Sequence, residues 1–184
     1  SLALKFTDPV DALRGLQFTE TGKGVTAKIA DKETASVFYL RTLSDFDPSA
    51  KVPIWMRRRI EKMGMRSISL VVDITNYVML ELGQPLHAFD KSKISGGLTI
   101  KRAGKSQKFI TLDGQERNLD PDDLMVCDDK QPLALAGTMG GLSSEITDTT
   151  TDIALEAVRF DPVCVAKNSR RHKLSSEASR RLER

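Results

Sequence analysis

The spacing of hydrophobic residues first becomes regular near Pro53. Met56, Ile60 and Met63 recur at helical spacing after this proline, and Gly64 follows as a residue that commonly ends a helix. The cations of the same stretch fall mostly on the other sides of the cylinder. This pattern predicts one amphipathic helix.

A second helix is predicted a few residues later. The chain looks extended from Ser67 to Val72, and Asp73 can then act as the N-cap of a helix that runs to Leu82. Gly83 and Pro85 are the expected stop signals. The polar residues near Asp73 are therefore expected at the mouth of this helix.

In the middle of the chain, the spacing of hydrophobic residues changes to the alternation typical of strands. Asp113-Gly114 is a strong hairpin-turn signal between two such runs. Extended segments are predicted at 38–43, 98–102, 108–112, 115–119, 124–127, 133–136 and 153–158.

Helices are expected again near the end of the chain. Asp161 and Pro162 provide an N-cap and a first-turn proline, and Ser175 or Ser176 can cap another helix that has Glu177 in its first turn. We therefore predict an α+β fold: a mixed, strand-rich core with flanking helices in a compact two-lobed unit. The first fifty residues are only weakly assigned.

Composition excludes several classes of protein. With 40% hydrophobic and 29% charged residues among 184, the chain is neither disordered nor fibrous. No apolar run approaches the roughly 18 residues of a membrane span, and the start lacks a signal-peptide layout, so a cytoplasmic location is expected. Cys127, Cys164, His87 and His172 lack ligand spacing, so no metal is expected.

Positive charge is concentrated at the end of the chain. The formal net charge is only +3, yet 167–184 contains seven cations and two acids. Such a cluster can neutralise phosphates, although a solvated helix face is the commoner explanation.

Four ordered blocks carry a resemblance to a known family. Together they resemble the beta subunit of bacterial phenylalanyl-tRNA synthetases. The likeness is good over 53–184, loose before that, and corresponds to the third and fourth domains, which implies a chain truncated at both ends from a longer polypeptide. The blocks are Val72–Asp90, Leu135–Gly141, Leu155–Pro162 and Arg170–Arg184.

The resemblance implies an activity and partners. The family charges tRNA(Phe) with phenylalanine, and this part of the subunit hydrolyses tyrosine mistakenly attached to that tRNA. It implies a synthetase alpha subunit as partner in a two-alpha, two-beta assembly. ATP and magnesium are expected for the whole synthetase, and no cofactor for this domain.

Physical chemistry explains why a second site is needed. An apolar pocket for phenylalanine cannot strongly reject a side chain that only adds a hydroxyl. A buried acceptor in a second pocket reverses the selection, because phenylalanine leaves it unpaired at a cost of about 1–3 kcal/mol.

Glu156 is the candidate for this acceptor. By alternation it shares a strand face with Ala154 and Val158, and the family's tyrosine-reading glutamate falls at its position. The simpler alternative is an edge strand on which Glu156 faces water or pairs with Arg159 or Arg102.

His87 and Asn76 are the candidate catalytic residues. The resemblance implies that both line the editing pocket, where they would orient the substrate or a water molecule. Alternatively, His87, read as a loop residue, caps a turn and Asn76 bonds the backbone at its helix start. No Ser-His-Asp order accompanies them.

Four further residues are candidates for substrate binding. Gly140 lies in a glycine-rich edge that allows close backbone approach, with plain turns as the alternative. Ala178 matches a family block directly, and Ser176 keeps the hydroxyl where the family often has threonine, although a helix cap explains the serine as well. Thr75 belongs to the polar group beside Asn76.

Two other functions remain compatible with the sequence. The basic end and the lack of a self-sufficient catalytic triad also suit a non-catalytic RNA-binding or subunit-interface module. A free-standing aminoacyl-tRNA deacylase built from the same domain is the second alternative.

Overall fold

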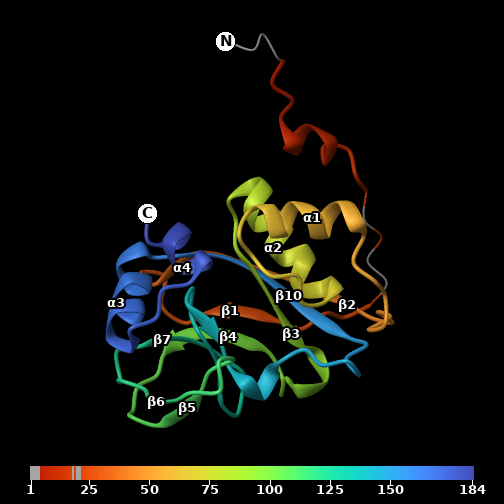
Figure 1. Ribbon diagram of the computed structural model, residues 1–184. Helices are drawn as coiled ribbons and strands as arrows, with labels where there is room; N and C mark the ends of the chain where they lie inside the picture. The colour runs from red at the N-terminus through yellow and green to blue at the C-terminus, as the bar shows by residue number, and fades with distance from the viewer. Residues whose placement is uncertain (1–4, 18, 20–21) are drawn as a thin grey trace.

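A three-stranded antiparallel sheet forms the middle of the molecule. The computed structural model describes residues 5–17, 19 and 22–184. The central strand β10 (Ile153–Phe160) pairs with β2 (Ala35–Leu43) on one side and with β3 (Leu86–Asp90) on the other. Figure 1 shows this sheet between a pair of helices and a second sheet.

The second sheet has five strands in the order β1-β4-β7-β8-β9. Its strand β7 is buried at every position, because one hydrophobic cluster covers Leu124 and Val126 while another covers Met125 and Cys127. The strands are β1 (Ala27–Ile29), β4 (Leu98–Arg102), β7 (Leu124–Cys127), β8 (Pro132–Leu135) and β9 (Met139–Gly140).

The main core lies between the two sheets. Alternate residues of β10, from Ala154 to Phe160, point toward the five-stranded sheet and are buried there. At roughly 25 cal/mol per Å² of apolar surface, this shared core is the main stabilising contribution. The predicted α+β fold with flanking helices is confirmed.

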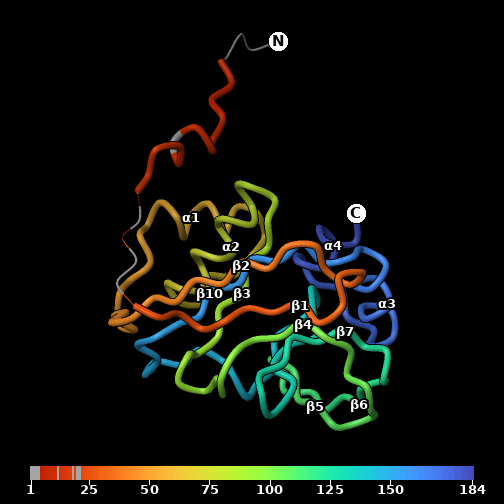
Figure 2. The backbone as a smooth tube through the Cα atoms, turned by 180° about the vertical axis from the view of Figure 1, so that it is seen from behind, coloured from red at the N-terminus to blue at the C-terminus, as the bar shows by residue number. Residues whose placement is uncertain are grey.

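Helices α1 (Ile54–Lys62) and α2 (Leu70–Leu82) pack against each other. Figures 1 and 2 both place them beside the three-stranded sheet, away from the five-stranded one. The predicted first helix is confirmed: Met56 and Ile60 are its buried residues, and Gly64 follows it with a positive φ of 81°.

The start of α2 differs from the prediction. Ser69, not Asp73, is its N-cap, so the expected extended conformation over 70–72 is wrong. Asp73 is buried in the first turn and accepts hydrogen bonds from the Ser67 hydroxyl at 2.5 Å and the Ile68 amide at 2.9 Å. The acid therefore holds the incoming loop on the first turn of the helix.

Most other predicted elements are present. The hairpin of β5 (Lys108–Ile110) and β6 (Glu116–Asn118) turns at Asp113-Gly114. The Asp-Gly pair therefore predicted this hairpin correctly. Strands β1, β3 and β9 were not predicted. All three are short; β1 and β3 pair with strands far away in the chain, whereas β9 pairs with the neighbouring strand β8.

Two helices follow β10. Asp161 caps α3 (Pro162–His172) by accepting from the Cys164 amide at 2.8 Å. Ser176 caps α4 (Glu177–Leu182) in a capping box with Ser179. Both predicted caps are confirmed, with Ser176 rather than Ser175 in the second.

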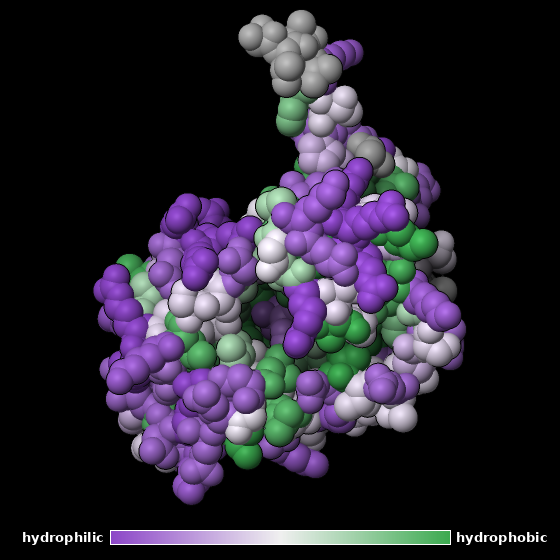
Figure 3. All heavy atoms as spheres, in the orientation of Figure 1, coloured by the Kyte–Doolittle hydropathy of each residue, from purple (hydrophilic) through white to green (hydrophobic). Residues whose placement is uncertain are grey.

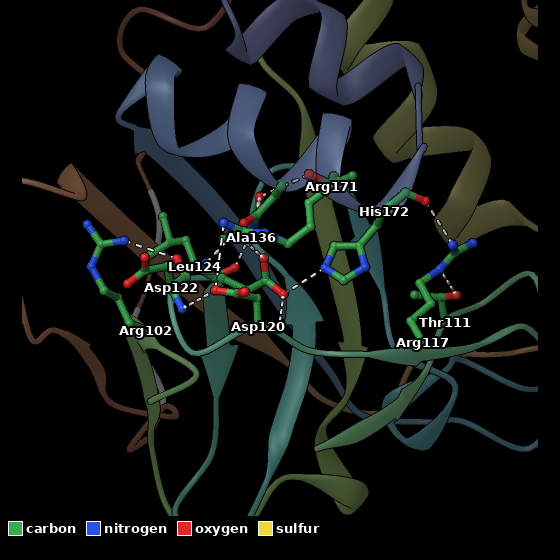
Figure 4. Close-up of polar contacts among 12 residues, drawn as sticks. Arg102, Thr111, Arg117, Asp120, Asp122, Leu124, Ala136, Arg171 and His172 are labelled. Carbon is green, nitrogen blue, oxygen red and sulfur yellow. Dashed lines mark hydrogen bonds and ion pairs between the residues drawn. The ribbon is translucent and has the colours of Figure 1, made fainter. Parts of the chain in front are cut away.

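A buried carboxylate fastens α3 to the five-stranded sheet. Asp123 has no exposed surface, and its carboxylate contacts His172 Nε2 at 2.6 Å, the guanidinium of Arg171, and the Asp120 amide at 2.8 Å. Figure 4 shows how these side chains converge below the helix. The arrangement fixes the end of α3, and with it the start of α4.

An amide side chain adds to this connection. Asn168 Oδ1 accepts from the Leu124 amide at 3.1 Å, and its Nδ2 donates to the Leu124 carbonyl at 2.8 Å. The buried Asn168 thus pairs with β7 as a neighbouring strand would. Helix α3 is therefore held by polar contacts at two successive turns.

We predict that Asp123→Ala lowers the free energy of unfolding by about 3 kcal/mol, because it leaves His172 and Arg171 without their buried partner. Urea denaturation measures the change. Asp122→Ala is the matched control, since Asp122 is exposed, and we expect it to cost less than about 0.5 kcal/mol. Equal effects of the two substitutions would contradict the role given to Asp123.

Candidate functional site

A cavity of about 80 Å³ lies where the two sheets and α4 meet. Figure 3 shows a hollow in the middle of this face of the molecule. The lining residues come from β3 and the residue before it, β8, β9 and the turn between them, β10 and α4: Pro85, Leu86, His87, Ala134, Leu135, Ala136, Gly137, Thr138, Met139, Gly140, Glu156, Val158, Phe160, Ala178 and Leu182.

Glu156 is the acidic residue of this lining. Its side chain is 6% exposed on the central strand, and its Oε2 has no hydrogen-bond partner among the described residues. Burial raises the pKa of this carboxyl to about 8, so it is mostly protonated at neutral pH. The alternative in which Glu156 faces water on an edge strand is wrong, because β10 is paired on both sides.

His87 lies directly opposite Glu156 in the β3–β10 register. Its ring packs edge-on against Phe89, with the ring centroids 4.4 Å apart. The ring keeps a little exposure, yet protein atoms surround it and lower the pKa of the imidazole to about 4. His87 was expected in a loop; it belongs to a strand, and it is neutral at pH 7.

Gly140 makes room for the imidazole. A Cβ atom at this position would lie 2.5 Å from Cε1 and 2.8 Å from Nε2 of His87. These distances are shorter than any van der Waals contact, so a side chain here displaces the ring. The glycine therefore acts by having no side chain.

Ser176 is connected to the cavity through Thr138. Its hydroxyl donates to the Thr138 carbonyl at 2.8 Å and accepts from the Ser179 amide at 3.0 Å. Ser176 thus caps α4 and holds the helix on the turn that lines the cavity, although it does not line the cavity itself. Ala178 and Leu182, which are one helical turn apart on α4, line the cavity.

The structure does not bring Thr75 and Asn76 into the lining. Both are on α2, where the buried Thr75 hydroxyl donates to the Val72 carbonyl at 2.8 Å and Asn76 is half-buried. Of the sequence candidates, the cavity collects His87, Gly140, Glu156 and Ala178. The chemical roles assigned to all seven stay predictions.

Several lining residues were missed by sequence reasoning. Thr138 and Met139 lie between two glycines of a block that was already singled out, and Leu182 is four residues after Ala178 on the same helix face. Those adjacencies were usable signals. Pro85 and Leu86 directly precede His87 in another of the blocks, so the same adjacency applied to them.

The lining suggests the chemistry that is possible here. A protonated carboxyl and a neutral imidazole stand side by side in an otherwise mostly apolar cavity, so each can exchange a hydrogen bond with a polar atom of a bound group. The lining has no serine, cysteine or lysine, and the Thr138 hydroxyl donates to the Ala136 carbonyl at 3.3 Å, so we take a water molecule as the nucleophile at such a site. A hydrolytic reaction needs no more than this.

Within residues 5–17, 19 and 22–184, no group of three or more His, Cys, Asp or Glu side chains is placed to hold a metal ion. In the same part of the chain, no helix has both the length and the apolar character needed to cross a membrane.

Comparison with known proteins identifies the class. The B3/4 domain matches residues 34–184, and the chain belongs to this family. The relatives named here are beta subunits of one enzyme. The chain is 54% identical to the phenylalanine–tRNA ligase beta subunit of Streptomyces avermitilis over 164 residues, which is 88% of this chain and 20% of that protein.

Other relatives agree. The phenylalanine–tRNA ligase beta subunit of Thermobifida fusca is 52% identical over 98% of this chain and 21% of its own length, and that of Corynebacterium glutamicum is 46% identical over 100% and 23%. The chain thus spans about a fifth of the length of these relatives. The resemblance seen in the four sequence blocks is confirmed.

A solved structure shows the same fold. An N-terminal fragment of the phenylalanyl-tRNA synthetase beta subunit from Pyrococcus horikoshii superposes with a TM-score of 0.58 over 78% of this chain and 45% of that fragment. At 12% sequence identity, the agreement concerns the fold.

The two shifted pKa values predict how stability depends on pH. The pKa of Glu156 is 4.5 in the unfolded chain and about 8 in the folded protein. Its contribution to the free energy of unfolding is therefore complete below pH 4.5 and is lost as the pH rises through 8. His87, shifted from 6.5 to about 4, destabilises the fold only as the pH falls through that interval. The interval from pH 6.5 to 8 therefore reports on Glu156.

We predict that the free energy of unfolding falls by about 1.5 kcal/mol more between pH 6.5 and 8 in the wild type than in Glu156→Gln. Urea titrations at several pH values measure the slope. Glu145→Gln is the matched control at an exposed glutamate and should keep the wild-type slope. A wild-type slope in Glu156→Gln would show that the carboxyl is ionised in the folded protein.

Proposed function

We propose that this chain hydrolyses the ester of tRNA(Phe) mischarged with tyrosine. The observation that carries the proposal is the buried Glu156 carboxyl, which has an unpartnered oxygen and faces an apolar cavity beside His87. A buried polar atom without a partner costs about 1–3 kcal/mol, so it favours a ligand that supplies a hydrogen bond there. A phenol hydroxyl on an aromatic ring is such a ligand.

The chemistry of the relatives explains the need. A ligase that selects phenylalanine through an apolar pocket discriminates by only about a hundredfold against a side chain with one added hydroxyl. A second site that selects for the hydroxyl removes the errors. Tyrosine satisfies Glu156, whereas phenylalanine leaves its oxygen unpaired.

Glu156 is suited to read a phenol in its protonated form. The carboxyl oxygen accepts the phenol O–H, and the carboxyl O–H can donate to the phenol oxygen, so both groups are satisfied without burying a charge. An ionised carboxylate in this cavity would lack a counter-charge from the lining. The neutral acid avoids that cost.

The neutral imidazole of His87 is assigned to the water. With no described residue hydrogen-bonded to the ring, a nitrogen is free to accept a proton from the attacking water and orient it toward the ester carbonyl. Thr75 and Asn76, on α2, would contribute only if the substrate extends beyond the cavity. Ser176 is a positioning residue that acts through Thr138.

The ring is expected to enter beside α4. At roughly 30 Å³ per water, the cavity has room for two or three water molecules, so an aromatic ring requires a wall to yield. Helix α4 has only six residues and carries Ala178 and Leu182 into the cavity. We assign the required movement to this helix.

The relatives support wider proposals about the whole enzyme. A synthetase alpha subunit is the proposed partner, in a two-alpha, two-beta assembly in the cytoplasm. ATP and magnesium belong to the charging reaction of the whole ligase, and the hydrolysis proposed here uses neither.

We predict that Glu156→Ala lowers the ratio of Tyr-tRNA to Phe-tRNA hydrolysis about tenfold in the full-length synthetase, because the acceptor for the phenol is removed. Glu156→Gln should lower it less, since an amide oxygen still accepts. The two hydrolysis rates are measured separately, with phenylalanine charging as the check that the enzyme is folded. Unchanged ratios in both folded variants would remove Glu156 from substrate selection.

We predict a different pattern for His87→Ala. Loss of the group that orients the water should slow hydrolysis of Tyr-tRNA and Phe-tRNA alike, by about a hundredfold, and leave their ratio near the wild-type value. Gly140→Ala pushes the imidazole aside, so it should also slow the hydrolysis of both aminoacyl-tRNAs. A change of the ratio with an unchanged Tyr-tRNA rate would instead make His87 a selectivity residue.

A further inference from the structure

Helix α1 presents three cations and a tryptophan on one side. Trp55, Arg58, Arg59 and Lys62 occupy positions i, i+3, i+4 and i+7, which lie on one face of an α-helix. We call these four residues the Trp55 face. The residues that α1 buries, Met56 and Ile60, lie on another side.

The tryptophan is held in place but remains accessible. Its ring stands edge-on to Tyr77, with the centroids 5.3 Å apart and the planes at 86°, and the Arg59 guanidinium lies 5.4 Å from its centroid. Arg59 also donates to the Tyr77 hydroxyl at 2.5 Å, which in turn donates to Glu81 at 3.0 Å. Even so, Trp55 is 51% exposed.

Two cations of this face are available to a ligand. Arg58 and Lys62 are exposed, and neither forms an ion pair with a described residue. The acid of the same helix, Glu61, pairs with Arg57 at 3.3 Å. The face therefore combines unpaired positive charge with an exposed aromatic ring.

The position of α1 relative to the cavity adds a spatial argument. Figure 3, in the orientation of Figure 1, shows hydrophilic side chains gathered over α1 on the same face of the molecule as the hollow. A long polyanion that reaches the hollow across this face can therefore contact α1 as well. Cations on one side of a helix suit such a ligand.

We propose that the Trp55 face binds RNA, with Arg58 and Lys62 on backbone phosphates and a base stacked on Trp55. The inference deepens the proposed function, since the RNA would be the tRNA whose 3′ end enters the cavity. Phosphates attract unpaired cations irrespective of sequence, and every base has a face that stacks on an aromatic ring. The buried centre of a protein interface, by contrast, is depleted of charge.

The chain contains one tryptophan, so its fluorescence reports on this face alone. Uncharged tRNA(Phe) titrated into the 184-residue chain is expected to quench the emission of Trp55. If two phosphates are bound, the affinity should fall about tenfold between 50 and 200 mM salt. Inorganic polyphosphate, which has no bases, should compete for the site without quenching.

Charge variants test the assignment of the cations. Arg58→Glu/Lys62→Glu should weaken tRNA binding at least tenfold. Lys105→Glu/Lys108→Glu changes the net charge equally at exposed lysines near or in the β5–β6 hairpin, and should bind like the wild type. The anisotropy of labelled tRNA measures the affinity of both double variants. In the same assay, Trp55→Phe should bind tRNA normally and Trp55→Ala should bind it more weakly.

Three outcomes would overturn the proposal. Absence of quenching, or equal weakening in both double variants, would show that this face has no specific contact with RNA. Separation of the synthetase subunits by Arg58→Glu/Lys62→Glu, with unchanged tRNA affinity, would assign the face to a protein interface. Because the titration uses uncharged tRNA, it is independent of hydrolysis: failure here leaves the editing proposal standing, and the reverse also holds.

Discussion

The pairing of β10 on both of its edges is the constraint on which the site depends. A strand between two others has its side chains on two faces, and here one face lies against the five-stranded sheet, so Glu156 is buried together with Ala154 and Val158. The same register puts His87 opposite Glu156. A slip of one residue would move Glu156 to the other face of the sheet, which is why this register is strongly specified.

Buried polar groups in this molecule fall into two kinds. Asp123 is buried and fully engaged with His172, Arg171 and a backbone amide, and this supports α3 and the turn beyond it. Glu156 is equally buried but has an oxygen without a partner, and His87 beside it has no counter-charge. Satisfied buried groups stabilise a fold, whereas unsatisfied ones that share a cavity suit a ligand.

The cavity and the Trp55 face would divide the recognition of one substrate. The cavity offers hydrogen bonds and apolar walls, which discriminate between side chains that differ by one hydroxyl. The Trp55 face offers charge and a stacking surface, which hold RNA without regard to the amino acid it carries. Since α2 contacts α1 and leads into β3, the same short stretch of chain supports both.

Local signals in the sequence determined the elements: Pro53 and Gly64 around α1, Asp113-Gly114 in the hairpin, and the caps Asp161 and Ser176, because each acts through neighbouring backbone groups. Alternation also placed Glu156 on one face of a strand. Only the tertiary structure decided that His87 lies in β3 opposite Glu156, that Asn76 lies outside the cavity lining, and that Asp73 receives a loop instead of capping a helix. The first two outcomes depend on contacts between segments distant in the chain, and the third on how the loop at Ser67 and Ile68 folds back onto α2; hydrophobic spacing specifies none of them.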